Sequence, residues 1–101
     1  MQQKIYGFYH VCQINHWREI VREQIKTLVA SGLYKASENI FIGALGSENN
    51  LADLRKLIKP YSKIVIEYHS ENIEEYEFAT LKLLKVKAQK EKFYGYYFHV
   101  K

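Results

Sequence analysis

Four short apolar runs alternate with three segments of helical periodicity, and this alternation constrains the fold more than any other feature. The runs cover residues 4–12, 39–46, 62–69 and 94–100, and they are rich in β-branched and aromatic residues. Each segment between them is long enough for a crossover helix, and strands joined by such crossovers pair in parallel. The sequence therefore predicts an α/β domain built on a four-stranded parallel sheet.

The helical segments carry their own start and stop signals. Residues 16–31 have apolar side chains at i, i+3 and i+4 spacing, with Asn15 as the candidate N-cap and Gly32 at the left-handed position after the helix. A shorter helix is expected before Pro60, which cannot continue it, and a third helix is expected over residues 73–92. Helices on both faces of the sheet would give three layers.

The handedness of parallel crossovers limits the strand order. Right-handed connections favour a half-Rossmann sheet with the order 3-2-1-4, and a flavodoxin-like order, 2-1-3-4, is the alternative. In both arrangements all strands end at one edge of the sheet. Ligands bind outside that edge, at the point where the strand order reverses.

Three strands place a histidine after an aromatic residue close to their carboxyl ends. These histidines are His10, His69 and His99, and the order 3-2-1-4 puts the first and the last on neighbouring strands at the reversal point. Gly46 follows the second strand at the same edge. A single histidine at a strand end is more often structural than functional, whereas three at one edge become candidates for a ligand site.

Two other chemical interpretations of these residues stay open. His10, Cys12, His69 and His99 have the atom types that suit zinc, although they lack a compact ligand spacing. Cys12 with His10 or His16 would make a nucleophile–base pair, although Cys12 also fits a small buried apolar position. Neither G-x-G-x-x-G nor G-x-x-x-x-G-K-[ST] is present, so these glycine motifs give no support to a dinucleotide site or a P-loop.

Several polar residues near the predicted helix starts have two interpretations each. The tripeptide SEN occurs at 47–49 and 70–72, where it would cap a helix or present free N–H groups to a phosphate. Trp17 fits the core, with base stacking as the alternative. Glu77 and Thr80 lie near the start of the third helix and face either the crevice or solvent.

The charge and the cysteine content exclude some classes of protein. The net charge of +4 comes from 15 basic and 11 acidic residues. Residues 73–92 are acidic at their start and lysine-rich at their end, which suits the helix dipole and needs no nucleic acid. No nucleic-acid-binding module is recognisable. One cysteine excludes an internal disulfide, and with no signal-peptide pattern we expect a cytoplasmic protein.

The dispersed motifs carry a resemblance that covers essentially the whole chain. In order they are FYHV, NHWREIVREQIKTLVASGLY, IFIGALG, IEYHS, EYEFATLKLLKVKAQK and YYFHVK. This succession resembles the N-terminal half of a bacterial and large-virus group of GT-A type glycosyltransferase-like proteins, in which a strand ends like YLHTKG.

The resemblance implies a function and a set of residues. Residues 1–101 would be one Rossmann-like, nucleotide-sugar-binding half-domain, a fragment of a longer glycosyltransferase and inactive alone. The longer enzyme would transfer a sugar from a nucleotide diphosphate to a glycan or lipid-linked acceptor. The matched donor-side residues are His10, Gly46, His69, Ser70, His99 and Lys101.

The sequence departs from the GT-A pattern at the metal site. These enzymes commonly hold a divalent metal through Asp-x-Asp near the end of the fourth strand, whereas the only aspartate here is Asp53 and that place reads FHVK. Metal dependence therefore stays open, and His99 or Lys101 would offset the diphosphate charge instead.

Two further partners and two alternative functions accompany this prediction. Peripheral membrane association and a homodimer through the free edge of the fourth strand are expected partners. A non-catalytic α/β binding or interaction module is the main alternative function, and a histidine-based metal-dependent enzyme is the next. No catalytic residue is assigned.

Overall fold

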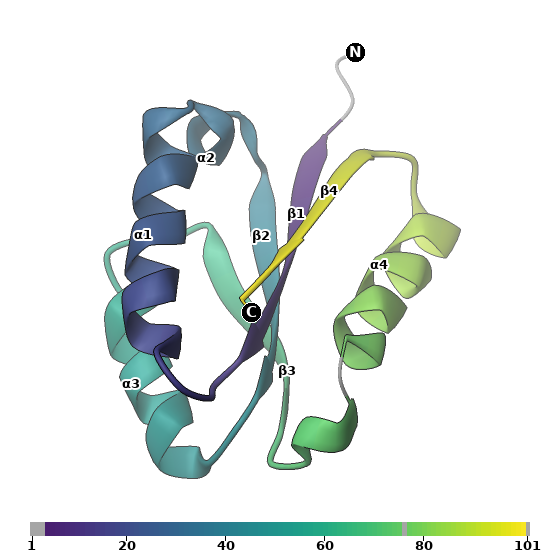
Figure 1. Cartoon of the computed structure of the whole chain (residues 1–101). Helices are drawn as coiled ribbons and strands as arrows, with labels where there is room; N and C mark the ends of the chain where they lie inside the picture. Colours follow the sequence, from purple (N-terminus) through teal and green to yellow (C-terminus); the bar gives the residue numbers. More distant parts are fainter. Residues whose placement is uncertain (1–3, 76, 101) are drawn as a thin grey trace.

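The computed structural model of the chain describes residues 4–75 and 77–100, in which strands and helices alternate as predicted (Figure 1). The elements are β1 (Ile5–Cys12), α1 (Trp17–Ala30), α2 (Leu33–Ala36), β2 (Asn39–Leu45), α3 (Glu48–Ile58), β3 (Ile64–Ser70), the 3-10 turn η1 (Ile73–Glu75), α4 (Phe78–Lys90) and β4 (Tyr94–His99). None of the helices in these ranges is both long and apolar enough to cross a bilayer.

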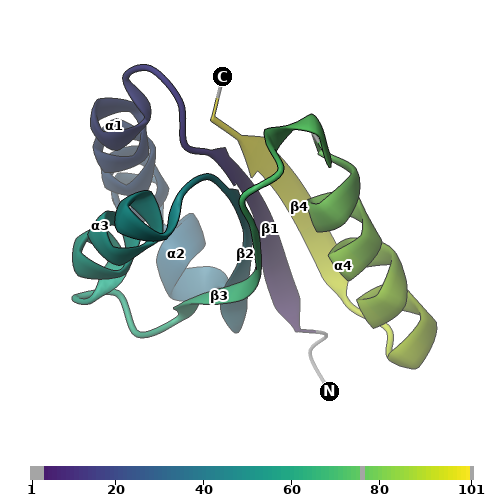
Figure 2. The same cartoon turned by 90° about the horizontal axis from the view of Figure 1, so that it is seen from below.

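The four strands form one parallel sheet in the order β3-β2-β1-β4. This confirms the predicted half-Rossmann order, and the flavodoxin-like alternative is wrong. Helices α1, α2 and α3 cover one face of the sheet and α4 lies on the other, so the domain has the three layers expected (Figures 1 and 2).

The core lies between the sheet and the pair α1 and α3. Alternate residues of β1 and β2 point into it, and α1 contributes residues spaced three or four apart, as an amphipathic helix does. The fully buried members include Tyr9, Val11, Trp17, Val21, Ile40, Ile42 and Leu54. Trp17 is 1% exposed, so its interpretation as a core residue is confirmed.

The third predicted helix begins later than the sequence suggested. Residues 73–75 form a separate 3-10 turn, and α4 begins only at Phe78. The Asn72 side chain accepts a hydrogen bond from the Glu74 N–H at 3.0 Å. This bond caps the 3-10 turn separately from α4. The predicted start at residue 73 was therefore wrong, and α4 spans 13 residues.

The connection around α1 also differs in two details. Asn15 has φ +53° and does not cap the helix; His16 occupies the N-cap position without a side-chain cap. Gly32 adopts the predicted left-handed conformation, with φ +83°. The chain then forms α2, which the sequence did not predict because a single helical turn has too little periodicity to detect.

Candidate functional site

The strand order reverses between the carboxyl ends of β1 and β4, the position at which open α/β sheets have their ligand crevice. The connection from β1 to β2 runs through α1 on one face of the sheet, and the connection from β3 to β4 runs through α4 on the other (Figures 1 and 2). His10 and His99 are register partners on these two strands. Two of the predicted site residues therefore lie side by side at the reversal point.

His10 is buried at this end of the sheet. Its side chain is 3% exposed, and its Nδ1 lies 2.9 Å from the hydroxyl of Thr80, which is fully buried on α4. Burial lowers the pKa of His10, the nearby His99 lowers it further, and the Glu77 carboxylate opposes both effects. His10 is thus a neutral imidazole that joins the sheet to α4.

His99 is the more accessible imidazole of the pair. Its Nδ1 lies 3.3 Å from a carboxylate oxygen of Glu77, and the two side chains are 29% and 45% exposed. The Tyr97 ring stacks on the imidazole with a centroid distance of 5.9 Å. Burial is the main cause that raises the pKa of the Tyr97 phenol to about 12. The other ring nitrogen of His99, Nε2, has no hydrogen-bond partner among residues 4–75 and 77–100.

Glu77 and Thr80 are the functional candidates whose orientation the sequence left undecided. Both face the crevice from the start of α4, one at each histidine. The signal in the sequence was their position within the first turn of a helix that follows a strand. The partner of each residue could not be known before the strand order was fixed.

His69 reaches the same edge of the sheet but lies on the opposite face. A bulge between Ile42 and Gly43 shifts the pairing of β2 with β3, so that His69 pairs with Ala44. A shift by one residue moves a side chain to the other face of a sheet. The His69 Nε2 lies 2.8 Å from the carbonyl oxygen of Gly46, on the side of α1 and α3. The three histidines therefore share an edge, and only two share a site.

The remaining predicted residues have structural contacts at this edge. The Ser70 hydroxyl accepts a hydrogen bond from the Asn72 N–H at 3.1 Å, and its carbonyl accepts one from Gly46 at 2.9 Å. A side chain on Gly46 would approach within 2.7 Å of Gln13, so the glycine permits a close packing of two loops. Lys101 lies outside the described residues.

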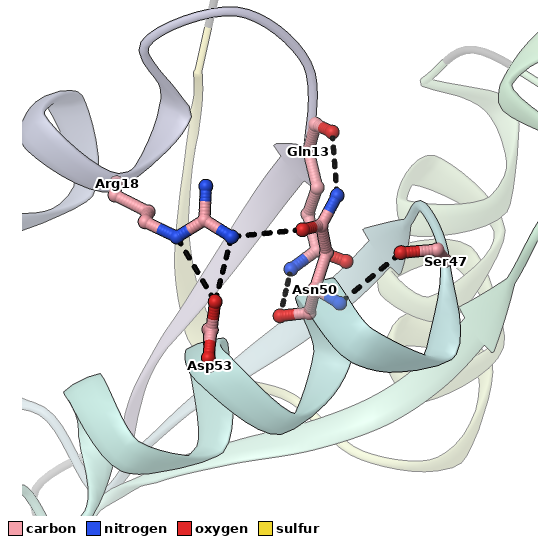
Figure 3. Close-up of polar contacts among 5 residues, drawn as sticks. All are labelled: Gln13, Arg18, Ser47, Asn50 and Asp53. Atoms are coloured by element: carbon pink, nitrogen blue, oxygen red, sulfur yellow. Dashed lines mark hydrogen bonds and ion pairs between the residues drawn. The ribbon is translucent and has the colours of Figure 1, made fainter.

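A polar network joins the loop after β1 to the start of α3 (Figure 3). Ser47 caps α3 by accepting from the Asn50 N–H at 3.1 Å, which confirms the first SEN as a cap. The side chains of Gln13 and Asn50 each donate to the backbone carbonyl of the other residue, at 2.7 and 3.3 Å. Arg18 donates to Asn50 at 2.9 Å and to Asp53 at 2.6 and 3.1 Å.

This network holds two helices together and was missed by the sequence interpretation. Arg18 and Asp53 bond to each other across α1 and α3, so neither charge is directed at the crevice. Gln13 and Asn50 are 37 residues apart. No local pattern in the sequence marks this pair, because it forms only where the loop after β1 approaches the start of α3.

The metal and nucleophile interpretations find no support in the geometry. Within the described ranges, no group of three or more His, Cys, Asp or Glu side chains could hold a metal ion, and all four residues of the suggested zinc set are described. Burial raises the pKa of the Cys12 thiol, whereas an activated nucleophile needs a lowered value. The Nδ1 atoms of His10 and His16 face Thr80 and Glu19, respectively.

This end of the sheet thus offers one partly exposed imidazole, oriented by a carboxylate, beside one buried neutral imidazole. Such a pair can donate hydrogen bonds to an anionic ligand or accept a proton. No protein-family model matches the sequence, and neither a curated protein nor a solved structure matches it significantly.

The burial of His10 predicts a loss of stability in acid. An unfolded imidazole has a pKa of about 6.5, whereas the native ring stays neutral to lower pH. The unfolded state therefore binds more protons below about pH 6.5, and the free energy of unfolding falls as the pH decreases. We expect a lower melting temperature at about pH 5 than at about pH 7, and His10→Asn to reduce this difference.

The matched control for this prediction is His16→Asn. The His16 side chain is 89% exposed, so its replacement should leave the pH dependence as in the wild type. Melting curves at the two pH values, recorded for all three proteins, make the comparison. The same acid sensitivity in His10→Asn as in the wild type would contradict the assignment.

Proposed function

We propose that the crevice between the carboxyl ends of β1 and β4 binds the diphosphate of a nucleotide sugar, as the donor-binding part of a glycosyltransferase. The observation that carries the proposal is the register pairing of His10 with His99 at the point of strand-order reversal. The resemblance in sequence points to the same two histidines. The free cysteine, Cys12, supports a reducing compartment such as the cytoplasm.

The chemistry of the crevice suits an anionic group. His99 has Nδ1 directed at the Glu77 carboxylate and Nε2 without a partner in the described ranges, so in the doubly protonated ring Nε2–H can donate to a phosphate oxygen. The amino ends of α1 and α4 lie on either side of this edge, and unpaired N–H groups at helix starts favour anions. Both features favour a phosphate over a neutral ligand.

Each residue of the pair has a distinct role in the proposed complex. His99 contacts the diphosphate, Glu77 orients the His99 ring, and His10 supports the site from below through Thr80. Because Asp53 is bound to Arg18, this aspartate is not available for an Asp-x-Asp metal site at the end of β4. Acceptor binding, sugar transfer and the contribution of Lys101 stay predictions from the resemblance.

A calorimetric titration with UDP, GDP and their sugar conjugates tests the proposal. A hydrogen bond to a charged group contributes about 1.5–3 kcal/mol, so His99→Asn should weaken nucleotide binding by at least tenfold. Lys26→Asn, which removes an exposed cation from the second half of α1, is the control and should bind as the wild type does. Absence of binding at millimolar nucleotide, or equal affinity for uridine without phosphates, would refute the proposal.

The second candidate, a non-catalytic interaction module, is favoured by one observation. Helix α4 exposes large apolar side chains, with Phe78 at 73%, Leu81 at 41% and Val86 at 40% exposure. A surface of this kind is a feature of interaction sites. The polar contacts of the histidine pair run through Glu77 and Thr80 and include none of these three residues.

A further inference from the structure

Helix α4 is apolar around most of its circumference, yet it packs on only one side. Thr80 is its only fully buried residue. The apolar side chains that remain partly or largely exposed are Phe78, Leu81, Leu83, Leu84 and Val86. A helix that is hydrophobic on all sides is normally buried on all sides. The outer surface of α4 is therefore suited to a contact with another polypeptide.

A groove beside α4 extends this apolar surface onto the sheet. Its volume is about 660 Å³, and its walls include Phe41 of β2, Tyr68 of β3, and Phe78 and Val86 of α4. The groove lies against β2 and β3, and α4 is the only α-helix of the described ranges on this side of the sheet (Figure 2). Together, the groove and the outer surface of α4 form one continuous apolar face, which we call the α4 face.

Charges divide the α4 face into an acidic end and a basic end. Glu74 and Glu75 lie in η1, directly before the helix, whereas Lys82, Lys85 and Lys90 follow along it. Glu75 and Lys90 both line the groove. A partner that fits this face needs a basic region opposite the glutamates and an acidic region opposite the lysines.

A second copy of the chain satisfies this requirement when the two helices run antiparallel. A two-fold axis across α4 brings the acidic end of each copy to the basic end of the other, and it does so twice because the contact is isologous. A parallel arrangement would bring lysine to lysine. We propose that the α4 face is a homodimer interface in which two α4 helices pack antiparallel across a two-fold axis.

This interface differs from the dimer expected through the free edge of β4. A second copy also matches the charges of the α4 face better than an anionic membrane does. A membrane would attract the lysines and repel Glu74 and Glu75. None of the charged residues named for the α4 face belongs to the proposed nucleotide site. The test of the dimer therefore does not depend on the nucleotide proposal.

Light scattering coupled to gel filtration tests the proposal. At about 100 µM, a concentration that populates an interface of micromolar affinity, we expect twice the mass of the 12.0 kDa chain. Phe78→Asp should give a folded monomer, because Phe78 is 73% exposed and its replacement leaves the core of the single chain intact. Tyr94→Asp is the matched control, since Tyr94 is 65% exposed and begins β4. It should remain dimeric.

A charge reversal tests the antiparallel arrangement separately. Lys82→Glu should weaken dimerisation several-fold, whereas Lys26→Glu on the exposed side of α1 should not. A wild-type monomer at about 100 µM would overturn the proposal, whether or not it binds anionic vesicles. A dimer that survives Phe78→Asp and dissociates on Tyr94→Asp would overturn it in favour of the β4 edge.

Discussion

Gly43→Ala is expected to destabilise the protein by about 3 kcal/mol or more, at or above the upper end of the usual cost of overpacking a core. A Cβ atom at position 43 would lie 2.1 Å from the Thr80 hydroxyl oxygen, 3.1 Å from its Cβ and 3.3 Å from its Cα. A rotamer change of Thr80 moves the hydroxyl but breaks its contact with His10, and it leaves the contacts with Cβ and Cα in place. Helix α4 would have to move away from the sheet.

Denaturant unfolding of three variants measures this effect. Gly95→Ala is the matched strand glycine, and its nearest atom is the edge of the Phe93 ring at 3.0 Å, which can rotate. Gly95→Ala should lower the free energy of unfolding by less than about 1 kcal/mol, as a substitution without a buried clash usually does. Thr80→Ala removes the closest atom, so Gly43→Ala with Thr80→Ala should be less destabilised than the sum of the single variants. Equal costs for Gly43→Ala and Gly95→Ala would contradict the close helix–sheet contact.

Gln24→Met is expected to lower the free energy of unfolding by about 2–4 kcal/mol. It leaves the Tyr9 hydroxyl and the His99 carbonyl without partners, and each unpaired group costs about 1–3 kcal/mol. The Tyr9 hydroxyl donates to the side-chain oxygen of Gln24, whose amide donates to the His99 carbonyl at 2.9 Å. Tyr9 is fully buried and stacks on Phe98 with a centroid distance of 4.0 Å. Gln24 thus ties α1 to β1 and to the end of β4.

Melting curves test this second expectation. A loss of 1 kcal/mol lowers the melting temperature of a domain of this size by about 4–8 °C, so Gln24→Met should melt about 10 °C or more below the wild type. Glu23→Met, an exposed neighbour on the same helix, is the control and should change little. Adding Tyr9→Phe to Gln24→Met removes the stranded hydroxyl and should recover part of the loss. If Gln24→Met melts like Glu23→Met, the buried link is not a source of stability.

The sequence predicted the sheet because its determinants are local. Apolar runs and helical periodicity are visible along the chain. Together with the general right-handedness of parallel crossovers, they led to the predicted order 3-2-1-4. The errors lie where a single side chain or turn decides the geometry. Asn72 caps a separate 3-10 turn before α4, and Asn15 adopts a left-handed conformation and does not cap α1.

The site was predictable only in part, because a side chain's face depends on strand register. His10 and His99 were expected on neighbouring strands, and they pair in register. The bulge between Ile42 and Gly43 places the His69 side chain on the opposite face of the sheet from His10 and His99. No residue pattern in the sequence predicts this bulge. The contacts of Glu77 and Thr80 depend on where α4 crosses the sheet, which the sequence left open.

The most direct test of the nucleotide-binding proposal is a map of amide chemical shifts in isotope-labelled protein during titration with UDP and GDP. We expect saturable shifts at the carboxyl ends of β1 and β4, around His10 and His99, and at the start of α4 between Glu77 and Thr80. Absence of shifts at millimolar nucleotide would contradict it. Shifts confined to the groove beside Phe41 and Val86 would contradict it equally, because the ligand would then occupy the other side of α4.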